Sequence, residues 1–224
     1  HILLKNAHYN LIIGERSNGK TFAVLKYGLK RFCALGEQMA VVRRFSEDFT
    51  GKRGQTMFAA IEKEGLVEKY TNGEWNGIYY YSSRWYLCRY ADGKREEVNQ
   101  TPLAYGFSLS SGEHDKSTSY PGIKTILFDE FLSRTGYLKD EFVLFMNTIS
   151  TVARQRKDIK IFMCGNTVNK YCPYFKEMGL SNVPRQKQGT IDVYKYGDSS
   201  LRVAVEYCKP NEKGNPSDIL FAFN

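Results

Sequence analysis

NLIIGERSNGKTFAV, residues 10–24, joins an apolar run to a helix-forming run through a short loop bounded by glycines. This loop lies between a predicted strand and a predicted helix that ends at Gly36, which is the context that a phosphate-binding loop requires. A chance glycine-rich loop is the alternative, and the strand and helix on either side disfavour it. The pattern GxxxxGK(S/T) is matched by Gly14, Glu15, Arg16, Ser17, Asn18, Gly19, Lys20 and Thr21.

Each residue type in this loop has a physical reason to be there. Glycines let the backbone turn its N–H groups inward around a phosphate, and the start of the helix adds its positive dipole end. Lys20 can neutralise the β and γ phosphates of a nucleotide, and the Thr21 hydroxyl can ligate Mg²⁺. We therefore expect residues 14–21 to bind ATP with Mg²⁺.

A second candidate motif is KTILFDEF, residues 124–131, an apolar run that predicts a central buried strand ending at two acids. Such an acid at a strand end holds the metal in P-loop enzymes, and Asp129 is our candidate for that role. Glu130 is offset by one position, so it can face the γ phosphate and polarise a water for in-line attack. An acidic pair can also simply cap a strand at the surface. Together with the loop, it predicts ATP hydrolysis.

Two further polar residues follow predicted elements beside this acid strand. KIFMCGN ends at Asn166, whose amide can hydrogen-bond the attacking water or the γ phosphate, or can simply cap the turn. The predicted helix before it ends in an arginine-rich tip, residues 153–157. Arg154 in this tip is suited to stabilising the transition-state charge on a neighbouring subunit's nucleotide. Solvation or pairing with the helix dipole is the alternative role for this tip.

The remaining patterns place this chemistry in an α/β fold. We predict a single P-loop NTPase domain over residues 1–224, with three layers, a mostly parallel central sheet and the additional-strand, catalytic-glutamate topology. Its core covers about residues 9–175, and edge strands lie at about 189–208. The runs IYYYSSRWYLCRY and LAYGFSLSS, on either side of Asp92-Gly93, predict an inserted antiparallel hairpin. TMFAAIEKEGLVEKY predicts a helix that closes near Gly65.

Composition favours a polyanionic partner. The 32 Lys and Arg exceed the 24 Asp and Glu, which gives a formal charge of +8. That charge can also serve solubility alone. The five cysteines are widely spaced and predict neither a disulfide framework nor a zinc site. With no signal-peptide pattern and no apolar run of about 20 residues, we expect a soluble intracellular protein and no membrane partner.

The segment RRFSEDFTGKRG, residues 43–54, is the candidate DNA-contacting loop. Its glycine-flanked Lys-Arg pair suits a pore-lining loop that touches DNA phosphates, although a solvated charged loop fits equally well. Such contacts are independent of DNA sequence and sensitive to salt. The candidate contact residues are Arg43, Arg44, Lys52 and Arg53.

Several motifs in order carry a family resemblance: IIGERSNGKTFAV, GEQMAVVRR, KSTSYPGIKTILFDEF, and the stretch from VARQR to CGNTVNKYCPYF. They span most of Leu11 to Phe175, and the chain there resembles the packaging ATPases, or encapsidation proteins, of phi-twenty-nine-like phages. These are relatives of large terminase ATPase domains. The resemblance implies a homomeric, pentameric ring in the host cytoplasm, docked transiently on the portal of a procapsid. It implies translocation of double-stranded DNA during ATP hydrolysis, with a structural RNA between motor and capsid.

The resemblance also assigns roles to residues. Lys20, Thr21, Asp129 and Glu130 take the roles given above. Arg154 falls at the position of a trans-acting arginine finger, whereas Arg16 matches a phosphate-loop arginine that acts in cis in some terminases, so the two compete for one role. Lys116, in KSTSYP, falls on a second basic residue that acts across the subunit boundary.

The chain departs from the family in one respect, and two other functions are alternatives to a packaging ATPase. Family members carry a second, nuclease-like or vestigial domain, and we expect it to be absent from this chain, which has no clustered acids of a metal nuclease. A small-molecule kinase shares the phosphate loop but normally lacks the water-activating Glu. A GTPase-type assembly switch needs Asn-Lys-x-Asp; Asn169-Lys170 begins that motif, but Cys172 occupies the Asp position.

Overall fold

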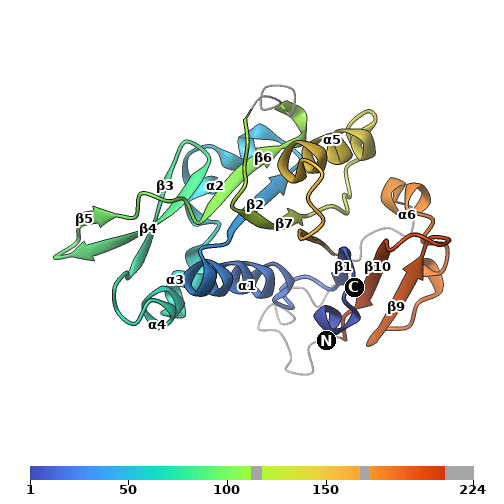
Figure 1. The fold of residues 1–224 in the computed structure, drawn as a ribbon, viewed down its shortest axis with the longest axis horizontal. Coiled ribbons are helices and arrows are strands. Elements are labelled where there is room, and N and C mark those ends of the chain that lie inside the picture. Colours follow the sequence, from blue (N-terminus) through green and yellow to red (C-terminus); the bar gives the residue numbers. More distant parts are fainter. Residues whose placement is uncertain (112–117, 167–171, 210–224) are drawn as a thin grey trace, which may run out of the picture.

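The computed structural model describes residues 1–111, 118–166 and 172–209, which form an α/β fold around one ten-stranded sheet (Figure 1). The strands are β1 (Tyr9–Gly14), β2 (Gln38–Arg43), β3 (Gly77–Tyr81), β4 (Arg84–Ala91), β5 (Lys94–Val98), β6 (Ala104–Ser108), β7 (Ile123–Asp129), β8 (Lys160–Asn166), β9 (Thr190–Lys195) and β10 (Arg202–Tyr207). The α-helices are α1 (Lys20–Leu35), α2 (Gly51–Thr56), α3 (Ala59–Lys63), α4 (Leu66–Tyr70), α5 (Glu141–Ala153) and α6 (Pro173–Glu177). Short 3₁₀ turns are η1 (Ile2–Lys5), η2 (Ser46–Phe49), η3 (Leu109–Ser111) and η4 (Val183–Arg185).

The strand order confirms the predicted topology. It runs β3-β4-β6-β2-β7-β8-β1-β10-β9, with β5 on β4. The strands from β6 to β10 in this order are parallel to one another. Strand β8 lies between the loop strand β1 and the acid strand β7, which is the additional strand of the predicted type. All three parallel strands therefore end at the same edge of the sheet.

The two faces of the sheet each bury their own core, because successive side chains of a strand point to opposite faces. In β7, Ile126 and Phe128 pack with residues of α5 and α6. Leu127 between them packs with residues of α1, α3 and α4 on the other face. Figure 1 shows α1 and α5 on different sides of the sheet. The fold thus has the three predicted layers. None of the helices in the described ranges is long and apolar enough to cross a membrane.

The inserted hairpin is present, but its strands differ from the prediction. The run IYYYSSRWYLCRY contains both β3 and β4, because Ser82 and Ser83 form a tight turn with positive φ angles of 48° and 56°. Asp92-Gly93, with φ of 50° and 73°, then joins β4 to β5. Strand β6, from LAYGFSLSS, instead lies parallel to β2 in the main sheet. Without a glycine in the Ser-Ser turn, the sequence gives no strong sign of it.

The C-terminal strands are not both edge strands, so that prediction is wrong for one of them. Strand β10 pairs with β1 on one side and with β9 on the other, and only β9 lies at the edge. Val203, Ala204 and Val205 are all buried, as expected of a strand covered on both faces. The main sheet therefore extends beyond the predicted limit near residue 175.

The charged segment after β2 is helical rather than an open loop. It forms η2 and then α2, and Phe49 is buried against Trp85 at a ring distance of 6.0 Å. Residues 56–70 contain two short helices, α3 and α4. Gly65, with φ of 62°, separates them: a helix closes near Gly65 as predicted, and Gly65 is then the N-cap of α4. The contact between Phe49 and Trp85 packs η2 against strand β4 of the hairpin.

Trp85 is the residue whose loss should destabilise this part of the fold most. It is fully buried, donates its Nε1–H to Gly54 O at 2.9 Å, and contacts three aromatic rings. We expect Trp85→Ala to lower the free energy of unfolding by about 3–5 kcal/mol in urea denaturation. Tyr81→Ala, at a 64% exposed position on the same hairpin, should change it by less than about 1 kcal/mol. Equal effects of the two changes would contradict this packing.

Candidate nucleotide site

The loop between β1 and α1 curves around the ammonium group of Lys20. Gly19 supplies a left-handed residue, φ 78°, just before the helix begins. Lys20 is buried, and burial lowers the pKa of its ammonium group. Its Nζ donates to Gly14 O at 3.3 Å, Glu15 O at 2.6 Å and Asn18 Oδ1 at 2.7 Å. The inner side of the loop is therefore a ring of polar groups around one cation.

The acid pair lies directly beside this loop. Thr21 Oγ1 donates to Asp129 Oδ1 at 2.5 Å, although 108 positions separate the two residues in the chain. Asp129 is buried, whereas the side chain of Glu130 is 57% exposed and lines the same cleft. This cleft has a volume of about 260 Å³. It is lined by Arg16, Ser17, Asn18, Gly19, Lys20, Thr21, Phe22, Asp129, Glu130, Cys164, Gly165 and Asn166.

Strand β8 contributes the third side of the cleft. Asn166, its last residue, stands opposite Gly14 in the β1 register. Gly165 lies where the segment after the acids packs closely on β8, because an added Cβ would meet Leu132 Cγ at 2.7 Å. The structure thus brings together the loop, the acid pair and Asn166, which the sequence places at three separate positions.

Arg43 lies in this site, at the end of a strand and not in an open loop. As the last residue of β2, it emerges at the edge where the neighbouring strand β7 ends. Its Nη2 donates to Asp129 Oδ2 at 2.6 Å, and its Nη1 donates to Glu130 Oε2 at 2.8 Å. The two acids are therefore bridged by one guanidinium group.

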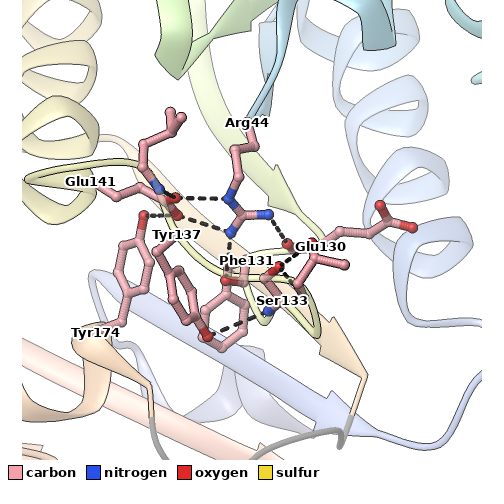
Figure 2. Close-up of polar contacts among 9 residues, drawn as sticks. Arg44, Glu130, Phe131, Ser133, Tyr137, Glu141 and Tyr174 are labelled. Carbon is pink, nitrogen blue, oxygen red and sulfur yellow. Dashed lines mark hydrogen bonds and ion pairs between the residues drawn. The ribbon is translucent and has the colours of Figure 1, made fainter.

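Arg44 is an interior residue, so its predicted contact with DNA phosphates is wrong. It is only 7% exposed, and its guanidinium group pairs with the buried carboxylate of Glu141 (Figure 2). In AVVRR, Arg43 ends the buried parallel strand β2 and Arg44 follows it. That pattern could have indicated that they emerge beside the acids, at the carboxyl edge of the sheet.

The other predicted basic residues lie away from the cleft or outside the described residues. Lys52 and Arg53 are exposed on α2, and Arg53 is 3.7 Å from Asp48. Arg154 follows the end of α5, lines a separate surface hollow, and donates from Nη2 to Thr118 O at 3.1 Å. Lys116 falls outside the described residues, as do Asn169 and Lys170. Within one chain, Arg16 is the candidate finger that lines the cleft.

The donor set of the cleft fits a magnesium nucleotide. Thr21 and Asp129 offer hard oxygen ligands next to the loop, which suit Mg²⁺. In the loop itself, Asn18 Nδ2 is buried and has no partner within the described residues, so the loop holds one unsatisfied donor. The described ranges hold no group of three or more His, Cys, Asp or Glu arranged for a metal. Such a metal therefore needs phosphate oxygens or water as further ligands.

Solved structures of packaging ATPases share this fold. The N-terminal domain of the DNA packaging ATPase from bacteriophage phi29 superposes with a TM-score of 0.70, at 24% identity, covering 95% of each chain. The Phi-28 gp11 DNA packaging motor gives a TM-score of 0.69, at 21% identity, over 99% of this chain and 63% of the other. The large terminase ATPase domain of Thermus phage P74-26 gives 0.51, at 16% identity, over 79% of this chain and 67% of the other.

Sequence comparison leads to the same group of proteins. The DNA packaging protein of Bacillus phage B103 is 29% identical over 174 residues, which cover 76% of this chain and 48% of the relative. That of Bacillus phage phi29 is 28% identical over 173 residues, 74% of this chain and 45% of the relative. The chain thus spans about half the length of these relatives. Residues 89–205, more than half of the chain, match the model of the podovirus DNA encapsidation protein (Gp16). The chain therefore belongs to the podovirus DNA encapsidation protein family.

Proposed function

We propose that this chain is the ATP-hydrolysing domain of a motor that drives double-stranded viral DNA into a procapsid. The observation that carries the proposal is the cleft in which the loop of residues 14–21, Asp129, Glu130 and Asn166 meet. Relatives named as DNA packaging proteins, and a similar fold in a DNA packaging ATPase, support the coupling of this site to DNA.

In the proposed reaction, water attacks the γ phosphorus of ATP and ADP leaves. The loop N–H groups and Lys20 hold the phosphates, while Thr21 and Asp129 hold Mg²⁺, which neutralises charge on the β and γ phosphates when bound. Glu130 polarises the attacking water and takes up its proton. Asn166 lies across the cleft, where its amide can hydrogen-bond the water or the γ phosphate.

Nucleotide binding requires two side chains to change partners. Lys20 now donates to acceptors of its own loop, and it must turn from them to reach phosphate oxygens. Arg43 now bonds both acids, and Glu130 must leave it to face a water. The loop and the acid pair are thus close enough to act on one nucleotide. Without a nucleotide, Lys20 is bonded to its own loop and the two acids are bonded to Arg43.

One of two arginines is proposed to stabilise the transition state. Arg16 lines the cleft and can act in cis. Arg154 lies on a different surface of the same chain, so a role in catalysis requires a neighbouring subunit's nucleotide. This second possibility fits a ring of identical subunits, for which the resemblance implies five copies, a portal partner and a structural RNA.

The catalytic assignment predicts different defects for two substitutions. Lys20→Ala should abolish tight binding of a fluorescent ATP analogue, because the loop loses the cation that neutralises the phosphates. Glu130→Gln should bind the analogue normally while its turnover falls by about a hundredfold or more. Phosphate release and equilibrium binding measure the two effects. Normal hydrolysis by the glutamine variant would show that Glu130 is not the base.

Stimulation of the ATPase by DNA tests the motor function. We expect duplex DNA, procapsids or both to raise the rate of phosphate release, and added salt to remove the effect of DNA. Lys52→Ala/Arg53→Ala should weaken DNA binding and lower the slope of log affinity against log salt by about 2, one for each phosphate contact. The matched control, Lys63→Ala/Lys69→Ala, removes two exposed charges from α3 and α4. Failure of DNA and procapsids to stimulate the wild-type chain would contradict the proposal.

A further inference from the structure

Glu130 sits in a backbone conformation that needs support from outside the sheet. Its φ is 58°, in the left-handed region that residues other than glycine rarely adopt. Strand β7 ends one residue earlier, at Asp129. The next N–H, that of Phe131, bonds Cys164 O at 3.2 Å on β8. The candidate base therefore stands on a sharp turn, and the turn decides where its carboxylate points.

The carbonyl groups of this turn are both held by Arg44. Its Nη1 donates to Glu130 O at 3.2 Å, and its Nη2 donates to Phe131 O at 3.0 Å (Figure 2). These two bonds fix the peptide planes on the C-terminal side of both residues. Because the peptide planes set the direction of the Cα–Cβ bond, they also set the direction in which the Glu130 side chain leaves the backbone.

Arg44 is itself held in place by a buried carboxylate. Its Nε and Nη2 donate to Glu141 Oε2 and Oε1 at 2.7 and 2.8 Å, and Glu141 is only 2% exposed. Glu141 also accepts hydrogen bonds from Tyr174 OH at 2.9 Å and from Leu138 N at 2.8 Å. Burial raises the pKa of Tyr174, so its hydroxyl stays a donor. A buried ion pair with this many hydrogen bonds has one defined geometry.

The network also restrains the segment that follows the turn. The Tyr137 ring lies 5.3 Å from Arg44 Cζ, and its hydroxyl accepts a hydrogen bond from Ser133 N at 3.3 Å. Figure 2 shows Tyr137, Glu141 and Tyr174 around the Arg44 side chain; they come from the segment between β7 and α5, from α5 and from α6. Glu141 is the first residue of α5, so Arg44 bonds both the start of this helix and the turn at Glu130.

We propose that Arg44 is a positioning residue for ATP hydrolysis. Held by Glu141, it fixes the left-handed turn at Glu130 and so directs the carboxylate of the base toward the nucleotide. The two neighbouring arginines thus bind different parts of the same turn. Arg43 binds the side chains of Asp129 and Glu130, and Arg44 binds the main-chain carbonyls of Glu130 and Phe131. The proposal rests on the proposed function, because it needs Glu130 to activate the water.

The test is a double-mutant cycle with Arg44→Lys and Glu130→Gln. Lysine keeps the charge but cannot bond two carbonyls and a carboxylate in the planar geometry of a guanidinium group. We expect Arg44→Lys to lower kcat by between about tenfold and about a hundredfold, while the dissociation constant of a fluorescent ATP analogue changes by less than about twofold. Because Arg44 acts through Glu130, adding Arg44→Lys to Glu130→Gln should cause no further loss of kcat.

Milder variants and a control keep the test decisive. Tyr174→Phe removes one hydrogen bond from Glu141, and Glu141→Gln removes its charge. Both should lower kcat without weakening nucleotide binding, and Glu141→Gln should lower it more. Arg31→Lys breaks a similar two-bond pair with Glu37 near the other end of α1, and should leave kcat unchanged. Thermal unfolding of each variant shows whether the fold is retained.

Three results would overturn the positioning role. These are unchanged kcat in all three network variants, equal losses in kcat and in nucleotide affinity, and losses that multiply in the double variant. A Glu130→Gln variant with normal turnover would instead remove the proposed role of Glu130 and the positioning role with it. A slow Glu130→Gln with a fast Arg44→Lys would leave the proposed function intact and reject only the positioning role.

Discussion

The hydrogen bond from Thr21 Oγ1 to Asp129 Oδ1 joins the loop of residues 14–21 to the acid strand. It forms because β1 and β7 are parallel, with β8 between them, so that all three strands end at one edge of the sheet. The cleft lies at this edge, and its groups come from the ends of β7 and β8, from the loop after β1 and from the start of α1. A change in strand order would separate the loop from the acids even if every motif in the sequence were kept.

The next level of organisation is the pair of arginines at the end of β2. Arg43 bridges the acid side chains in the open cleft, whereas Arg44 lies in the interior and holds the backbone behind them. One strand thus supplies both the partner that nucleotide binding must displace and the support that stays in place. Glu141 connects this support to α5, whose far end carries Arg154. The candidate base and the candidate trans finger are therefore joined through one helix.

Much of this arrangement could be predicted from the sequence. Gly14 to Thr21 and the Asp129-Glu130 pair have local signatures, and parallel topology brings them together. The partners of Arg43 and Arg44 could not be predicted, because a basic residue after a strand looks the same whether it meets water, DNA or a carboxylate. Residues 43–54 also look like an exposed loop in the sequence, because the segment is mostly polar and charged. In the structure, Phe49 of this segment is buried. The Ser82-Ser83 turn lacks glycine, and β10 has too short an apolar run to distinguish a central strand from an edge strand.

A structure of this chain with Mg²⁺ and a non-hydrolysable ATP analogue tests the central claim most directly. The account predicts the triphosphate inside the curve of residues 14–21, Lys20 turned from its loop acceptors to the phosphates, and the metal beside Thr21 and Asp129. It also predicts that Glu130 keeps its left-handed backbone while its side chain leaves Arg43. A nucleotide bound outside the loop, or a metal remote from Asp129, would contradict the account.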